Sequence, residues 1–280
     1  MRSAVIAFAV LVAAALAGAA PDLTLLDLAD GRTLTLTEAV PLLRQQRIVL
    51  VGEEHTNPDH HRAQLQVIRA LADAGAKIAI GLEMFRRESQ PALDRWVAGE
   101  LSANAFEQVY AANWGYPWPA YRAIFEFARD RRIPMVALNV PPDITRQVAR
   151  NGFQSLSESQ RGALSDVTCS VDEEYMRYIR QVFGAHAHGH GNFTFFCEAQ
   201  MIWDTAMAVH ALDYLRARPD DTVVILTGVG HAQKGAVPRQ LRLRATAPLP
   251  VAALLPEIPG RLDRRTTDLQ DADYLITGLK

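Results

Sequence analysis

The sequence predicts an α/β fold with a mainly parallel central sheet flanked by helices. Three observations indicate this fold class: short apolar runs rich in β-branched residues recur, helical stretches separate them, and several runs end in polar residues. Strands that alternate with helices are typical of parallel sheets joined by crossover helices. The predicted strands cover residues 48–51, 78–82, 135–138 and 222–226, and a further strand covers residues 251–255.

Residues 1–20 have the composition of a secretory signal peptide. Arg2 precedes an apolar run at residues 4–16, and small residues follow up to Ala19. The alternative is an uncleaved membrane anchor. The run is short for a membrane span, which favours the cleaved signal peptide. No cysteine lies at the expected cleavage site directly after the run, which argues against a lipid anchor. We expect a periplasmic or secreted chain that meets membranes only by association.

The mature chain is predicted to begin with a hairpin. Apolar runs at residues 24–28 and 32–36 flank a turn at Gly31, which is a hairpin signal. Later in the chain, residues 194–216 keep the apolar spacing of a long helix.

The middle of the chain is predicted to be largely helical. Asp59 is expected to cap a helix that stops at Gly75. Two excursions near residues 88–131 and 142–191 are longer than ordinary crossovers, so we expect each to form a lid or a small subdomain. No linker is evident, and residues 21–280 are interpreted as one domain with two helical insertions.

Charge and cysteine content limit the function classes. The formal net charge is −2 with both signs scattered along the chain, which is not the pattern of a nucleic-acid-binding protein. The two cysteines, Cys169 and Cys197, either pair in an oxidising compartment or remain as one buried and one loop thiol.

Two histidines follow predicted strands in the same Gly-x-x-His pattern. They end Gly52-Glu-Glu-His55 and Gly228-Val-Gly-His231. Because ligands bind at the carboxyl ends of parallel strands, we expect both imidazoles and Glu83 at one rim. Two imidazoles with a carboxylate suit a divalent transition metal. The alternatives are that the histidines bond loop carbonyls and that Glu83 pairs with a nearby arginine.

Two further carboxylates are candidates for this rim. Neighbours on a strand face opposite sides, so one of Glu53 and Glu54 faces the site, and we favour Glu53 because it lies on the side of His55. Asp204 shares a helix face with Gln200 and is expected to orient His231 or His55.

Aromatic residues are concentrated where they could wall a flat ligand. Trp203 and Met207 lie beside Gln200 on the long helix, and a proline-bent loop carries Trp114, Tyr116 and Tyr121. A tyrosine phenolate can ligate ferric haem, while the alternative for the loop is a small satellite core. The histidines of His186-Ala-His188-Gly-His190 indicate either a metal or haem-iron site or a solvated loop.

Five motifs in order resemble the ChaN-like haem-binding uptake family of the Tiki superfamily. They are Val51-Gly-Glu-Glu-His55, Gly81-Leu-Glu83-Met-Phe85, Ala137-Leu-Asn139, Glu198-Ala-Gln200-x-x-Trp203-Asp204-x-x-Met207-Ala208 and Gly228-Val-Gly-His231. The resemblance implies an exported protein of haem or iron acquisition, and it implies His55, Glu83 and His231 as site residues. Relatives include Tiki-type proteases and erythromycin esterase-like hydrolases. Members are often lipoproteins, for which this chain lacks the cysteine.

Three functions follow from these observations. We expect a haem-binding protein of haem or iron uptake, with haem as cofactor, haem-transport components as partners, and a homodimer as one assembly. The alternative is a metal-dependent hydrolase in which His55, Glu83 and His231 hold the ion and Glu53 or Asp204 accepts a proton. A catalytically silent, partner-binding pocket is the third.

Overall fold

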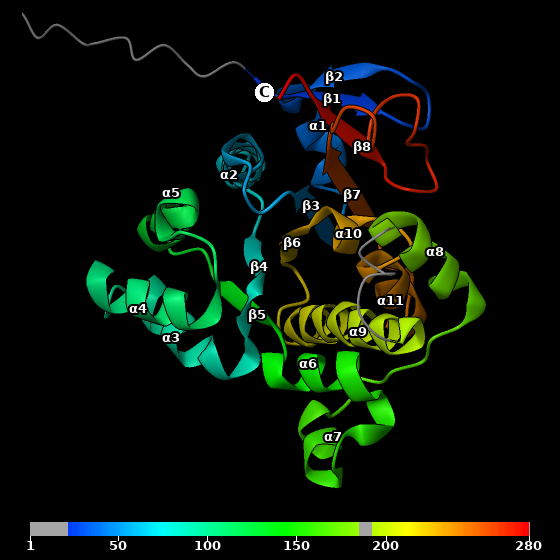
Figure 1. Ribbon diagram of the computed structural model, residues 1–280. Helices are drawn as coiled ribbons and strands as arrows, with labels where there is room; N and C mark the ends of the chain where they lie inside the picture. The colour runs from blue at the N-terminus through cyan, green and yellow to red at the C-terminus, as the bar shows by residue number, and fades with distance from the viewer. Residues whose placement is uncertain (1–21, 185–191, 280) are drawn as a thin grey trace, which may run out of the picture.

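The computed structural model describes residues 22–184 and 192–279, which form an eight-stranded sheet covered by helices (Figure 1). The strand order is β2-β1-β8-β7-β3-β6-β4-β5. The strands are β1 (Thr24–Asp27), β2 (Thr33–Thr35), β3 (Ile48–Glu53), β4 (Ile78–Arg86), β5 (Met135–Asn139), β6 (Thr222–Gly228), β7 (Val251–Pro256) and β8 (Tyr274–Thr277). Strands β3 to β8 pair in parallel, while β1 and β2 are antiparallel. The α/β fold class is thereby confirmed.

The five predicted crossover-sheet strands are confirmed, and two details differ. Strand β4 continues to Arg86, so Glu83 lies within the strand and not after it. Strand β8 was not predicted, because its four residues carry no long apolar run and depend on pairing with β1 and β7. The predicted hairpin is confirmed as the antiparallel pair β1–β2.

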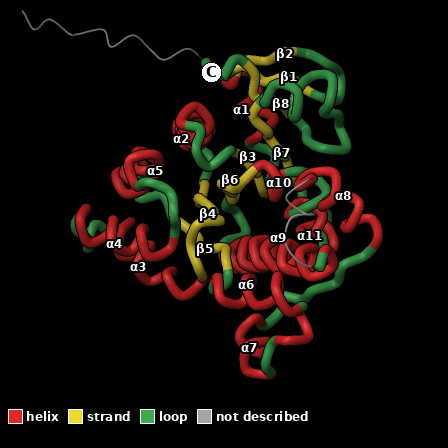
Figure 2. Tube along the Cα trace, viewed as in Figure 1, coloured by secondary structure: helices red, strands yellow, loops and turns green. Residues whose placement is uncertain are grey.

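Helices cover both faces of the sheet (Figure 2). The helices are α1 (Leu36–Leu43), α2 (Pro58–Asp73), α3 (Gln90–Val97), α4 (Ala103–Asn113), α5 (Trp118–Asp130), α6 (Pro142–Asn151), α7 (Glu158–Leu164), α8 (Glu173–Phe183), α9 (Phe193–Ala217), α10 (Val229–Ala232) and α11 (Val237–Arg244), with short 3₁₀ turns η1 (Arg87–Ser89) and η2 (Phe153–Ser155). Alternate residues of β3 point to opposite faces: Val49 and Val51 join the core under α1 to α5, and Ile48 and Leu50 join the core under α9 and α11.

Helix α2 begins two residues earlier than the sequence indicated. The side chain of Asn57 accepts a hydrogen bond from the Asp59 backbone N–H at 2.9 Å, so Asn57 and not Asp59 is the cap. Pro58 occupies the first turn, where its missing N–H costs nothing. At the other end Gly75 has a φ of +78° and the helix ends there, as predicted.

The helical content predicted for both long excursions is confirmed. Helices α3 to α5 separate β4 from β5, and α6 to α8 follow β5. The stretch 185–191, which contains the predicted histidine run at His186, His188 and His190, lies outside the described residues. No helix in the described part of the chain is long and apolar enough to cross a membrane.

Candidate functional site

The carboxyl ends of β3, β4 and β6 bring three predicted site residues together. His55 follows β3, Glu83 lies in β4, and His231 lies in the short helix α10 that follows β6. The Nε2 atom of His231 lies 3.9 Å from Oε1 of Glu83. A Cβ atom on Gly228 would lie 3.2 Å from Nε2 of His55 and 3.8 Å from Oε2 of Glu83. The glycine therefore lets the His55 imidazole and the Glu83 carboxylate approach each other.

Backbone and hydroxyl donors hold the Glu83 carboxylate. Its Oε2 atom accepts hydrogen bonds from the Thr227 hydroxyl at 2.6 Å and the Gly228 backbone N–H at 2.7 Å. The arginine partner considered from the sequence is not used, since Arg86 bonds to Asn113 instead. Glu83 is buried, so these donors offset the cost of removing its charge from water.

Glu53 is the centre of a buried network behind His55. Its Oε1 atom pairs with Nδ1 of His55 at 2.7 Å and accepts from the Tyr121 hydroxyl at 2.5 Å. Nε2 of His61 lies 3.1 Å from Oε2. Burial would raise the pKa of Glu53, but the bonds from His55 and His61 prevail and lower it to about 2. The carboxylate fixes Nδ1 of His55 and leaves Nε2 for the site.

A second carboxylate orients His231 in the same way. Oδ1 of Asp204 lies 2.6 Å from Nδ1 of His231, and the Tyr175 hydroxyl donates to Oδ2 at 2.5 Å. Burial would lower the pKa of His231, yet the charge of Asp204 and its hydrogen bond raise it to about 9. Of the two orientations considered from the sequence, Asp204 therefore takes the one toward His231. The Trp203 ring stands edge-on to this imidazole at 5.8 Å.

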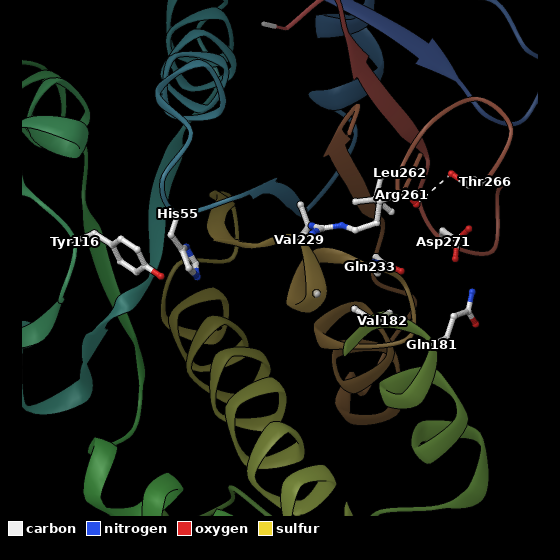
Figure 3. Close-up of a pocket in the computed structure, with 11 residues that line it drawn as sticks. His55, Tyr116, Gln181, Val182, Val229, Gln233, Arg261, Leu262, Thr266 and Asp271 are labelled. Carbon is white, nitrogen blue, oxygen red and sulfur yellow. Dashed lines mark hydrogen bonds between the residues drawn. The ribbon is translucent and has the colours of Figure 1, made fainter. Parts of the chain in front are cut away.

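A cavity of about 520 Å³ opens beside these residues (Figure 3). His55 and Tyr116 lie together at one end. Apolar walls come from Val182 of α8, Val229 of α10 and Leu262 of the loop between β7 and β8. Polar side chains at the far end are those of Gln181, Gln233 and Asp271 (Figure 3). The volume lies within the usual range of small-molecule sites, about 300–1,000 Å³.

Tyr116 is placed differently from the other tyrosines near the site. Its ring contacts that of His55, with centroids 5.0 Å apart, and it borders the cavity. No described residue forms a hydrogen bond with its hydroxyl, whereas the hydroxyls of Tyr121, Tyr175 and Tyr178 each have an acceptor. Tyr116 therefore offers a phenol that is open to a ligand.

The other sequence-predicted lining residues lie away from this cavity. Trp114 stands edge-on to His55 at 5.0 Å and supports it from the side. Tyr121 is fully buried, and Gln200 is buried in α9. Met207 lies in the core with its sulfur accepting from Thr227. The aromatic residues of the first helical insertion do not form a separate satellite core: Phe106, Tyr110, Trp118, Tyr121 and Phe125 belong to the main core on that face of the sheet.

Sequence reasoning missed one wall of the cavity. Arg261, Leu262 and Thr266 come from the loop between β7 and β8, and Gln181 and Val182 come from α8. No motif marks these positions, because only the tertiary fold brings them beside His55. The sole local signal is the Pro-Gly turn at Pro259-Gly260, which predicts a loop tip but no function.

The predicted metal ligands His55, Glu83 and His231 lie near one another. Within the described ranges, no group of three or more His, Cys, Asp or Glu side chains has the arrangement to hold a metal ion. Cys169 and Cys197 are free thiols, and the Cys169 thiol lies 3.6 Å from the Glu198 carbonyl oxygen. The site therefore offers oriented imidazoles and a phenol rather than a closed metal cage.

Two solved structures have folds similar to that of this chain. The chain is similar to ChaN of Campylobacter jejuni, a structure described as showing cofacial haem binding, with a TM-score of 0.72 and 17% identity over 91% of this chain and 96% of that one. It is also similar to the type III effector HopBA1, with a TM-score of 0.53 and 15% identity over 88% and 93% of the two chains.

Sequence comparison gives one distant relative and a family. Protein RETICULATA-RELATED 5, chloroplastic, of Arabidopsis thaliana is 25% identical over 126 residues, which are 42% of this chain and 17% of that protein. The chain thus spans less than a fifth of that relative's length. A family model described as haem-binding uptake, Tiki superfamily, ChaN, matches residues 39–241. The chain therefore belongs to the ChaN family of the Tiki superfamily.

Proposed function

We propose that this protein binds haem in the cavity beside His55, with the Tyr116 phenolate as ligand to the iron. The observation that carries the proposal is the position of Tyr116: its phenol borders the cavity and has no hydrogen-bond partner among the described residues. Phenolate is one of the protein ligands that hold ferric haem. Membership of a haem-binding family supports haem as the bound group.

The residues around the cavity fit a flat, largely apolar group. Val182, Val229 and Leu262 supply apolar surface. Such surface excludes water and stabilises a macrocycle in proportion to the area that it covers. At the other end, the His55 imidazole contacts the rings of both Trp114 and Tyr116, which also contact each other. The lining therefore combines apolar side chains with a phenol at one end and polar side chains at the other, as an amphipathic ligand such as haem requires.

His55 borders the cavity beside Tyr116 and is held there by Glu53. Burial would lower the pKa of His55, but its hydrogen bond to Glu53 and the charge of Glu83 raise it above the usual value. Bound ferric iron would supply the Lewis acidity that deprotonates the Tyr116 phenol. Glu53 contributes by fixing the orientation of the His55 ring.

Metal-dependent hydrolysis receives less support from the geometry. The paired carboxylate–imidazole contacts resemble those that orient metal ligands, and His55, Glu83 and His231 do converge. Their arrangement nevertheless lacks the three-donor set that a bound divalent ion needs. Binding is therefore proposed in preference to hydrolysis.

We also propose that the protein is exported and that it acts with partners. The composition of residues 1–20 supports a secreted or periplasmic location, where the protein would pass haem to transport components or act as a homodimer. The measurement that checks the location is N-terminal sequencing of the protein recovered from the periplasm and medium. Cleavage after Ala19 or Ala20 is expected, and an intact N-terminus in the cytoplasm would contradict it.

Haemin titration tests the binding proposal. We expect a saturable shift of the Soret band at about one haem per chain, with the spectral signature of tyrosinate ligation. Tyr116→Phe should lower the affinity at least about tenfold and remove that signature, since phenylalanine cannot ligate iron. Tyr274→Phe, in strand β8 away from the cavity, is the matched control and should bind as the wild type does. Unchanged ligation in Tyr116→Phe would refute Tyr116 as the ligand.

A further inference from the structure

The loop between β7 and β8 brings a cation to the cavity. The loop covers residues 257–273 and lies beyond residues 39–241, to which the family model matches (Figure 1, orange loop). Its tip is fixed by local bonds: Ile258 and Leu262 form a β-bridge, and the Asp263 carboxylate accepts from the Gly260 backbone N–H at 2.8 Å. Arg261 is therefore held in the turn between these anchors.

Arg261 is the one arginine or lysine among the eleven described residues that line the cavity. Its side chain extends from the loop across the cavity toward Val229 (Figure 3). It is 53% exposed, and its Nη1 atom lies 3.2 Å from Oε1 of Glu54. Asp271, the one carboxylate among the described lining residues, lies at the far end and accepts from the Asp268 backbone N–H at 3.1 Å.

The ion pair between Arg261 and Glu54 is weak enough for a ligand to replace Glu54. Exposed ion pairs contribute little stability, because water screens them and both side chains lose freedom when they pair. Glu54 follows Glu53 at the end of β3, so the pair keeps the guanidinium close to the mouth of the cavity. A ligand carboxylate can replace Glu54, because a guanidinium can bind a carboxylate through two parallel N–H···O bonds.

We propose that Arg261 binds a carboxylate of the ligand, which takes the place of Glu54. This inference rests on the proposed haem-binding function and narrows the ligand to an anionic porphyrin whose propionate lies against the β7–β8 loop. Glu54 then lowers the affinity for the ligand, whereas Arg261 raises it. In the free protein it holds the guanidinium, and during binding it competes with the ligand carboxylate and repels it.

The test uses two metal-free probes that differ only at their two propionate groups. Protoporphyrin IX carries two free carboxylates, and its dimethyl ester carries none. Binding of each is measured by fluorescence titration with the full chain and with three variants. Arg261→Gln should bind protoporphyrin IX about tenfold more weakly, and Glu54→Gln about threefold more tightly. Arg264→Gln removes the same charge from an exposed residue of the same loop outside the cavity and should change nothing.

The ester separates charge recognition from packing. Its affinity should be equal in all four proteins, and the advantage of the free acid in the wild type should shrink as salt is added. The inference is overturned if Arg261→Gln and Arg264→Gln bind the free acid equally, or if the ester suffers the same loss. In either case saturable haemin binding by the wild type leaves the proposed function intact. A wild type that binds neither haemin nor protoporphyrin IX refutes both.

Discussion

At the scale of single residues, the site depends on carboxylates that orient imidazoles. Glu53 accepts from Tyr121, pairs with His55 and lies 3.1 Å from a ring nitrogen of His61. Asp204 does the same for His231 with help from Tyr175. In both pairs the carboxylate takes Nδ1; Nε2 of His231 lies 3.9 Å from Oε1 of Glu83, and Nε2 of His55 lies beside Gly228. The histidines are thus fixed before any ligand arrives, which lowers the entropic cost of binding.

Glu53 gives the folded state a specific pH dependence. Its pKa is about 2 in the folded protein and 4.5 as an ordinary glutamate. A lowered folded-state pKa means that its contribution to stability is fully present above pH 4.5 and is lost as the pH falls toward 2. The loss amounts to about 3 kcal/mol in the free energy of unfolding.

Denaturant unfolding at several pH values measures this contribution. Glu53→Gln should be less stable than the wild type at neutral pH, and its stability should fall less between pH 4.5 and 2. Glu54→Gln, at the neighbouring position, should keep the acid dependence of the wild type. Equal acid slopes in Glu53→Gln and the wild type would contradict the buried network.

At the scale of elements, close packing between β4 and its neighbours positions Glu83. A Cβ atom on Gly81 would lie 2.8 Å from Cδ1 of Leu138, 3.1 Å from Cγ1 of Val223 and 3.2 Å from Cγ1 of Ile225. Strand β4 lies between β5 and β6, so these neighbours are themselves packed and cannot move freely. The glycine allows the strand that carries Glu83 to stay in register with β6.

Two glycine-to-alanine variants should have opposite effects on stability. Gly81→Ala overfills the core and should cost about 1–3 kcal/mol. Gly162→Ala lies in exposed helix α7, where no atom is within 4 Å of the added methyl, and should stabilise by about 0.5–1 kcal/mol. Urea unfolding midpoints compare them. If Gly81→Ala unfolds at the same urea midpoint as the wild type, the sheet tolerates the added methyl and this packing does not constrain β4.

Elements with a strong local signal could be predicted from the sequence. Runs of β-branched residues predict the parallel strands. Residues directly after these strands, such as His55 and His231, are therefore expected at the rim of the sheet. The short strand β8 and the observed N-cap of α2 could not be predicted from local sequence. The first depends on pairing with β1 and β7, and the second on Pro58 occupying the first helical turn.

At the scale of the whole molecule, the cavity joins segments that are far apart in the sequence. Tyr116 comes from the first helical insertion, Val182 from the second, and Arg261 from the loop before the last strand (Figures 1 and 3). Composition marked Tyr116 as a candidate because aromatic residues cluster around it. Nothing local marked Val182 or Arg261, since their role arises only when the three segments meet over α10.

This assembly also explains why predicted lining residues on α9 lie elsewhere. Gln200, Trp203 and Met207 share a helix that packs on one face of the sheet, so Met207 enters the core and Trp203 contacts His231. Helical spacing identifies a shared face, but it does not say whether that face meets a cavity or a sheet. The distinction needs the position of α8 and of the β7–β8 loop.

The position of iron in the haemin complex tests the central claim most directly. Crystals grown with haemin and measured at the iron absorption edge would locate the metal by its anomalous scattering. We expect one iron site per chain, bonded to the Tyr116 hydroxyl oxygen, with the porphyrin between Val229 and Leu262. An iron site away from this cavity, or bonded to another residue while Tyr116 remains unligated, would contradict the account.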